Sequence, residues 1–116
     1  MGILDWALGN PSDKEVDRYA DDFMKTVENS LPQELKDVKK RALAGEAEAQ
    51  YQIGVYYWNF WNTEGCQKNY ARANKDTRAF YVAHHKAGMH FVYEAEHQGY
   101  ELAKIYLRQH SKYYRG

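Results

Sequence analysis

Three side chains near the C-terminal end of the chain could act together on a metal ion. His90, Glu94 and His97 are separated by four and three residues, so one face of a helix would carry all of them. Glu94 and His97 also form one Glu-x-x-His sequence, which is the half-site of di-iron carboxylate bundles. A complete site needs a second such motif and two further helical glutamates, and no second motif follows in the sequence. We therefore expect no metal and no other cofactor, and keep a small metal-dependent enzyme using these residues as an alternative.

The sequence lacks the residues that nucleophilic catalysis and phosphate binding require. The single cysteine, Cys66, lies beside Gly65 in a polar segment, and no residue is identified as its catalytic base. One cysteine also forms no internal disulfide, which fits a reducing cytoplasm. The eight glycines are too scattered for a phosphate-binding loop. The sequence therefore predicts a cytoplasmic protein that is not an enzyme.

Composition bounds the class of protein. The 116 residues carry 16 basic and 16 acidic side chains, a length that fits one domain over residues 1–116. Eleven Tyr and three Trp add the apolar area that a low aliphatic content lacks. No apolar stretch approaches the ~18 residues of a membrane helix, and the first ten residues lack the basic start of a secretory signal. We expect a folded domain with an aromatic core and no membrane contact.

Helical periodicity runs through the whole chain, and no segment alternates like a strand. Ser12 and Glu15 form a capping box, Ser30 is the expected cap of the next helix, and Asp76 or Thr77 that of the fourth. Gly88 could kink or split this fourth helix. The sequence predicts an all-α fold of about five helices: 12–29, 31–44, 46–62, 77–98 and 100–113, with a short turn or helix at 3–8 and a polar loop at 62–75.

The third of these helices is apolar on two sides, which indicates that neighbours pack against both. Gly54 lies in its interior, where glycine costs ~1 kcal/mol relative to alanine. Close approach of another helix is the natural reason for a glycine there. In the last helix we expect four side chains to point inward: Leu102, Ala103, Tyr106 and Leu107.

An internal repeat has two copies of a glycine, a small alanine and a large aliphatic residue at offsets of zero, four and eight. The copies are Gly45, Ala49 and Ile53, and, 54 residues later (99 − 45 = 54), Gly99, Ala103 and Leu107. In both copies the glycine is expected to follow one helix and open the next. This layout is typical of helix-pair repeats, in which each unit buries its face against its neighbours.

At these residues the chain resembles the Sel-one-like repeat family, relatives of the tetratricopeptide repeats. The matching stretches are AGEAEAQYQIGVYYW (44–58) and YEAEHQGYELAKIYL (93–107). The 54-residue spacing is longer than the usual unit of that family, and Arg108 stands where its second glycine should fall. The resemblance implies antiparallel helix-pair packing, with an N-terminal helical cap (1–44) and a degenerate repeat region (45–116). It also implies a scaffold that binds other proteins.

We therefore predict that the protein is a module that binds a specific protein partner. It could be an inhibitor or immunity protein, an adaptor or a chaperone, and it could also form homo-oligomers. The third helix carries more large aromatic side chains than one neighbour can cover, and Tyr and Trp dominate interface energies. We predict that the partner surface consists of Tyr57, Trp58, Trp61, Arg72 and Arg78. The alternative is that the N-terminal helices cover this face through Trp6, Tyr19 and Phe23.

Nucleic acid is the other alternative partner. Residues 1–44 hold nine acids and seven bases, a net charge of −2, and residues 45–116 hold seven acids and nine bases, a net charge of +2. Basic residues alternate with aromatic ones near the C-terminus, a pattern that could hold a single strand by phosphate contacts and stacking: Lys104, Arg108, Lys112 and Arg115, with Tyr106, Tyr113 and Tyr114. Because the overall charge is balanced, we expect only weak, nonspecific binding.

Overall fold

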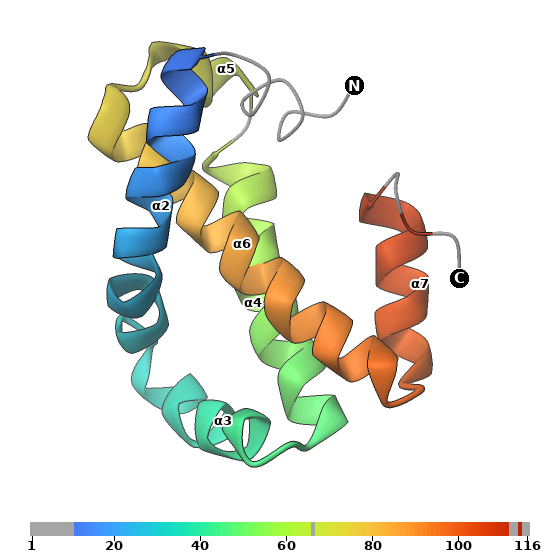
Figure 1. The fold of residues 1–116 in the computed structure, drawn as a ribbon. Helices are drawn as coiled ribbons and strands as arrows, with labels where there is room; N and C mark the ends of the chain where they lie inside the picture. Colours follow the sequence, from blue (N-terminus) through green and yellow to red (C-terminus); the bar gives the residue numbers. More distant parts are fainter. Residues whose placement is uncertain (1–10, 66, 112–113, 115–116) are drawn as a thin grey trace.

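The computed structural model describes residues 11–65, 67–111 and 114, and Figure 1 shows their arrangement. Within these residues there is no strand, so the all-α prediction is confirmed. The helices are α2 (Pro11–Asn29), α3 (Gln33–Leu43), α4 (Ala47–Thr63), α5 (Gln67–Arg72), α6 (Lys75–His97) and α7 (Glu101–His110). The molecule measures 36 × 33 × 21 Å, and its short dimension equals about two helix diameters. The segment predicted at 3–8 lies outside the described residues.

The centre of the fold is the antiparallel pair α4 and α6, which cross at two glycines (Figure 1). A Cβ atom added to Gly54 would lie 2.8 Å from the backbone nitrogen of Val92. One added to Gly88 would lie 2.7 Å from the backbone nitrogen of Trp58. The two backbones are thus in direct contact, which confirms the reason inferred for Gly54. Gly88 does not split α6, which continues to His97.

The remaining helices cover this pair from different sides. α2 lies across α6 and buries Val16, Ala20 and Val27, while α3 packs on α4 (Figure 1). Lys86 of α6 extends to α2, where its ammonium lies 2.6 Å from the Asp17 carboxylate and 2.8 Å from that of Asp21. The acidic α2 is therefore joined to the rest of the molecule by charge as well as by apolar contact.

Two turns with the same hydrogen bonds begin α4 and α7. Gly45 and Gly99 have φ angles of 101° and 83°, a region that favours glycine. After α3, the Glu46 N–H donates to Arg41 O at 3.1 Å; after α6, the Tyr100 N–H donates to Ala95 O at 3.1 Å. Both are Schellman-type ends, which satisfy carbonyls that a helix terminus would leave unpaired. The turns predicted from the internal repeat are thus present, whereas the repeat type of the packing and the division at residue 44 stay predictions.

Four local expectations are corrected by the structure. Ser30 does not cap α3, because its hydroxyl donates back to Thr26 O in α2 at 2.6 Å. The cap of α6 is Asn74, whose side-chain oxygen accepts from the Thr77 N–H at 2.8 Å. The predicted loop contains α5, and the last helix ends at His110 rather than near Tyr113. The capping contact of Ser12 with Glu15 involves side chains that the structure does not describe.

None of the helices in the described part of the chain is both long enough and apolar enough to span a bilayer.

Candidate functional site

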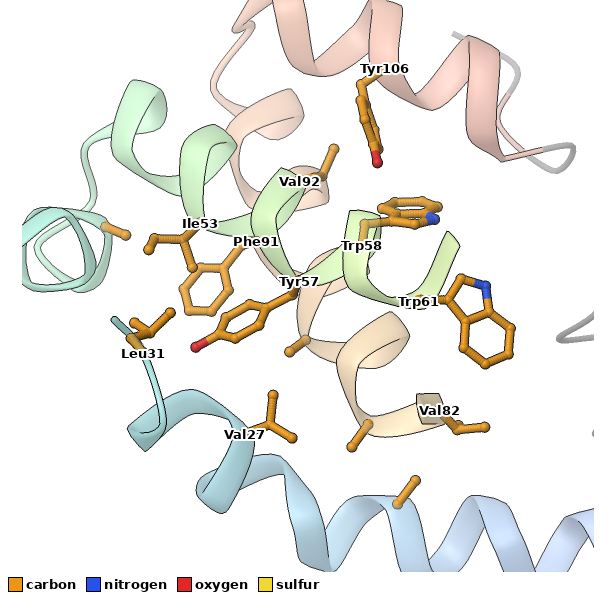
Figure 2. Packing of buried hydrophobic residues seen from close by; sticks show 14 of the residues in the cluster. Val27, Leu31, Ile53, Tyr57, Trp58, Trp61, Val82, Phe91, Val92 and Tyr106 are labelled. Atoms are coloured by element: carbon orange, nitrogen blue, oxygen red, sulfur yellow. The ribbon is translucent and has the colours of Figure 1, made fainter. Parts of the chain in front are cut away.

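The aromatic residues predicted to form the partner surface are core residues. Tyr57, Trp58 and Trp61 expose 1%, 2% and 5% of their surface, so the expectation that this face is open is wrong. Figure 2 shows part of the reason: Phe91 and Val27 lie around Tyr57, and Tyr106 lies beside Trp58. The prediction assumed that one neighbouring element covers the aromatic side chains of α4. In the structure several elements cover them.

Each of the three is covered by a different part of the chain. The Tyr57 ring stacks on Phe91, and its hydroxyl donates to Glu28 O at the end of α2 at 3.2 Å. Burial is the main reason why the pKa of Tyr57 is raised. The Trp58 ring meets Tyr106 of α7 at 5.3 Å, as Figure 2 shows. Trp61 lies 6.0 Å from the Tyr70 ring of α5.

The alternative cover consisted of three N-terminal residues, of which the structure describes Tyr19 and Phe23. Tyr19 is 41% exposed, and Phe23 lies against Phe80 of α6. Trp6 lies outside the described residues. Among the described residues, rings of α5, α6 and α7 cover the three side chains, and the end of α2 accepts the hydrogen bond of Tyr57.

The two arginines of the predicted surface differ from each other. The Arg78 guanidinium donates to Tyr70 O at 3.0 Å and to Ala71 O and Ala73 O at 3.1 Å, and it lies over the Tyr70 ring. It therefore fixes the C-terminal end of α5 to α6, a structural role. Arg72 is exposed. The structure does not bring the five predicted residues together into one accessible surface.

Two buried histidines on α6 were not identified from the sequence as parts of one aromatic core. His84 stacks on Phe60 at 3.8 Å, and His85 lies between Trp58 and Trp61 with both ring centroids 5.0 Å away. The Nδ1 atom of His85 has no hydrogen-bond partner among the described residues, and burial lowers the pKa of His85 to about 4. Burial also lowers the pKa of His84, whose Nδ1 lies 2.9 Å from Phe80 O. Adjacent residues point to different sides of a helix, as expected, but nothing in the sequence showed that both sides are buried.

The candidate metal ligands are not gathered by the fold. Among the described residues no three histidine, cysteine, aspartate or glutamate side chains are close enough to hold a metal ion. His90, Glu94 and His97 are all exposed on α6. The Nε2 atom of His97 lies 3.8 Å from the carboxylate of Glu96, its neighbour in sequence. The spacing that placed the three on one helix therefore does not assemble a site.

The basic and aromatic C-terminal pattern is described only in part. Tyr106 is buried, and its hydroxyl donates to the Asn59 side chain at 3.2 Å, so its ring is not available for stacking on a base. The Tyr114 hydroxyl donates to the Glu96 carboxylate at 3.1 Å. Cys66, Lys112, Tyr113 and Arg115 lie outside the described residues.

An apolar face on α7 is left open instead. Leu102 and Ile105 expose 48% and 39% of their surface and lie one helical turn apart. The prediction that Leu102 points inward is therefore wrong, whereas Ala103, Tyr106 and Leu107 are buried as expected. We call this pair of side chains the α7 face.

The internal repeat shows what covers the corresponding face in the first copy. With an offset of 54, Ile105 corresponds to Tyr51 of α4 (105 − 51 = 54). Tyr51 contacts the rings of Tyr100 and Tyr106, 5.5 Å and 6.4 Å away, at the start and middle of α7. Tyr51 is thus partly buried against a following helix, whereas Ile105 is exposed. Glu48, the counterpart of Leu102 (102 − 54 = 48), is exposed as Leu102 is.

Compared with protein-family models, with curated proteins and with solved structures, the chain matches none of them. The resemblance to Sel-one-like repeats therefore stays a prediction.

Proposed function

We propose that the protein is an interaction module that binds a helix of a partner protein along the α7 face. The observation that carries the proposal is the correspondence of Tyr51 with Ile105, because the Tyr51 ring packs against Tyr100 and Tyr106 whereas Ile105 is exposed. An inhibitor, an adaptor and a chaperone would all use such a surface.

A helix is the occupant that this geometry favours. Leu102 and Ile105 are three residues apart, the spacing at which one helix presents side chains to a helix lying beside it. Apolar side chains of this size on a surface helix are stabilised when a partner covers them, by about 25 cal/mol for each Å² removed from water. Two aliphatic side chains alone are too few for the roughly 800 Å² per partner of a stable interface, so the partner must also contact neighbouring surface.

Site-specific crosslinking tests the proposal. A photoreactive phenylalanine analogue is placed at Leu102 or, for comparison, at the exposed Arg72, which belongs to the surface predicted from the sequence. In the cells that make the protein, we expect one discrete adduct from position 102, mapped by mass spectrometry to a helical segment of another protein. The adduct should be lost when Ile105→Lys is added, since a charge would be buried without a partner.

Other outcomes would contradict this assignment. Equal adducts from positions 72 and 102 would show that the α7 face is not selective. An adduct between two copies of the chain would make the surface a dimer contact.

A further inference from the structure

A basic groove lies at the other end of the molecule, where α2 meets α3. It has a volume of about 310 Å³ and is lined by residues from the end of α2 and along α3. In Figure 1 these two helices form the left and lower edges of the molecule, away from α7. The groove is thus separate from the α7 face and adds a second surface to the proposed function.

Three lysines of α3 make the rim of this groove positive. Lys39 is held in place, because its ammonium donates to Glu28 O at 2.7 Å and to the Asn29 side chain at 3.2 Å. Lys36 and Lys40 have no carboxylate within 4.0 Å among the described residues. Glu28 is the one acidic side chain in the described part of the lining, so these residues together carry a net charge of +2.

An exposed leucine lies in the same surface. Leu43 exposes 67% of its surface, the largest fraction among the described large hydrophobic residues. It follows Lys36, Lys39 and Lys40 by seven, four and three residues, so all four side chains share one side of α3. Leu31, at the start of the groove, is 6% exposed and adds an apolar floor. The groove therefore combines an apolar centre with a cationic edge.

We propose that this groove, formed by Leu31, Lys36, Lys39, Lys40 and Leu43, binds an acidic segment of another protein that carries aliphatic side chains. The lysines complement its carboxylates, and the two leucines cover its apolar residues. Charge complementarity at the edge and apolar contact at the centre is the usual division of roles in a protein interface. A nucleic acid would meet the lysines but leave Leu43 uncovered, and the Glu28 carboxylate would repel its phosphates.

The experiment uses synthetic probes with the intact chain. A labelled dodecapeptide of Glu and Leu is compared with a Glu and Ser peptide of the same charge and with oligo(dT), by fluorescence anisotropy at low and physiological salt. We expect the Glu and Leu peptide to bind most tightly and to weaken as salt rises, because exposed charges are screened. The Glu and Ser peptide should bind severalfold more weakly, since it has nothing to bury against Leu43.

Matched variants locate the binding. Lys36→Glu with Lys40→Glu should weaken binding of the Glu and Leu peptide about tenfold, because two attractions become repulsions on an exposed surface. The control is Lys25→Glu with Lys68→Glu, which makes the same charge change at exposed positions on α2 and α5 and should alter binding less than about twofold. Leu43→Ala should weaken binding about threefold without affecting the oligo(dT) control. All of these positions are exposed, so the fold should be retained.

Four results would overturn the proposal. The first is no measurable binding of the Glu and Leu peptide at low salt. The second is equal binding of the two peptides, which would show charge attraction alone. The third is equal weakening by the two charge-reversed pairs, which would place the contact elsewhere. The fourth is tighter binding of oligo(dT) that is lost with the Lys36 and Lys40 changes, which would make the groove a nucleic-acid contact.

Discussion

Helices α4 and α7 begin alike and end in different surroundings. Each follows a glycine turn with the same hydrogen bonds, and each buries an alanine and an aliphatic residue in its first two turns. α4 then lies against α6 at Gly54, whereas the corresponding residue of α7 is Arg108 (108 − 54 = 54). A long side chain at this position prevents the close backbone contact that Gly54 allows. Two helices that begin with the same turn, such as α4 and α7, can therefore differ in which of their faces are covered.

The largest expected effect separates the covered face from the open one. Trp58→Ala should lower the free energy of unfolding by about 3–5 kcal/mol, because a buried tryptophan leaves a cavity against Tyr106 and His85. Leu102→Ala on the α7 face should lower it by less than about 1 kcal/mol. Urea denaturation followed by circular dichroism measures both. Similar losses in the two variants would break the comparison between the helices.

A smaller effect is the pH dependence of the free energy of unfolding, which tests whether water is excluded from the covered face of α4. In the folded chain the pKa of His85 is about 4, below the ordinary 6.5, so the unfolded chain binds the proton first as pH falls. Stability should therefore be unaffected by this group above pH 6.5 and decline between pH 6.5 and 4, by a total of about 3 kcal/mol. The lowered pKa of His84 acts in the same direction.

The contribution of His85 is isolated by subtraction. The difference in unfolding free energy between pH 7 and pH 4.5 should shrink in His85→Leu and stay unchanged in Leu102→Ala, which removes no titratable group. Comparing variants removes the titration of carboxylates, which is common to all of them. An unchanged pH dependence in His85→Leu would mean that water reaches the space between Trp58 and Trp61.

The smallest effect tests the similarity of the two turns. Gly45→Ala and Gly99→Ala should each lower the free energy of unfolding by about 1 kcal/mol, because both residues have positive φ angles. No steric clash adds to this cost, since a new Cβ would touch nothing within 4 Å. Thermal unfolding should show falls in Tm that agree within a few degrees for the two variants. A cost at only one of the turns would show that the two junctions are not equivalent.

Much of the fold was predictable because it depends on neighbours in sequence. The helical periodicity gave the all-α class, and the glycines at 45 and 99 marked the turns, since only local backbone geometry is involved. The interior Gly54 indicated a close helix contact, which α6 supplies. Caps were less predictable, because short polar side chains can bond to the backbone on either side of them: Ser30 donates back to Thr26 O, and Asn74 accepts from the Thr77 N–H.

The candidate site was not predictable in the same way, because exposure depends on residues far apart in sequence. The sequence by itself determined that α4 carries several large aromatic side chains. Only the tertiary structure decided that α5, α6 and α7 cover the aromatic rings, while Leu43, Leu102 and Ile105 stay exposed. The physical reason is that helix periodicity is set by bonds within four residues, whereas burial is set by the helix that arrives from elsewhere in the chain.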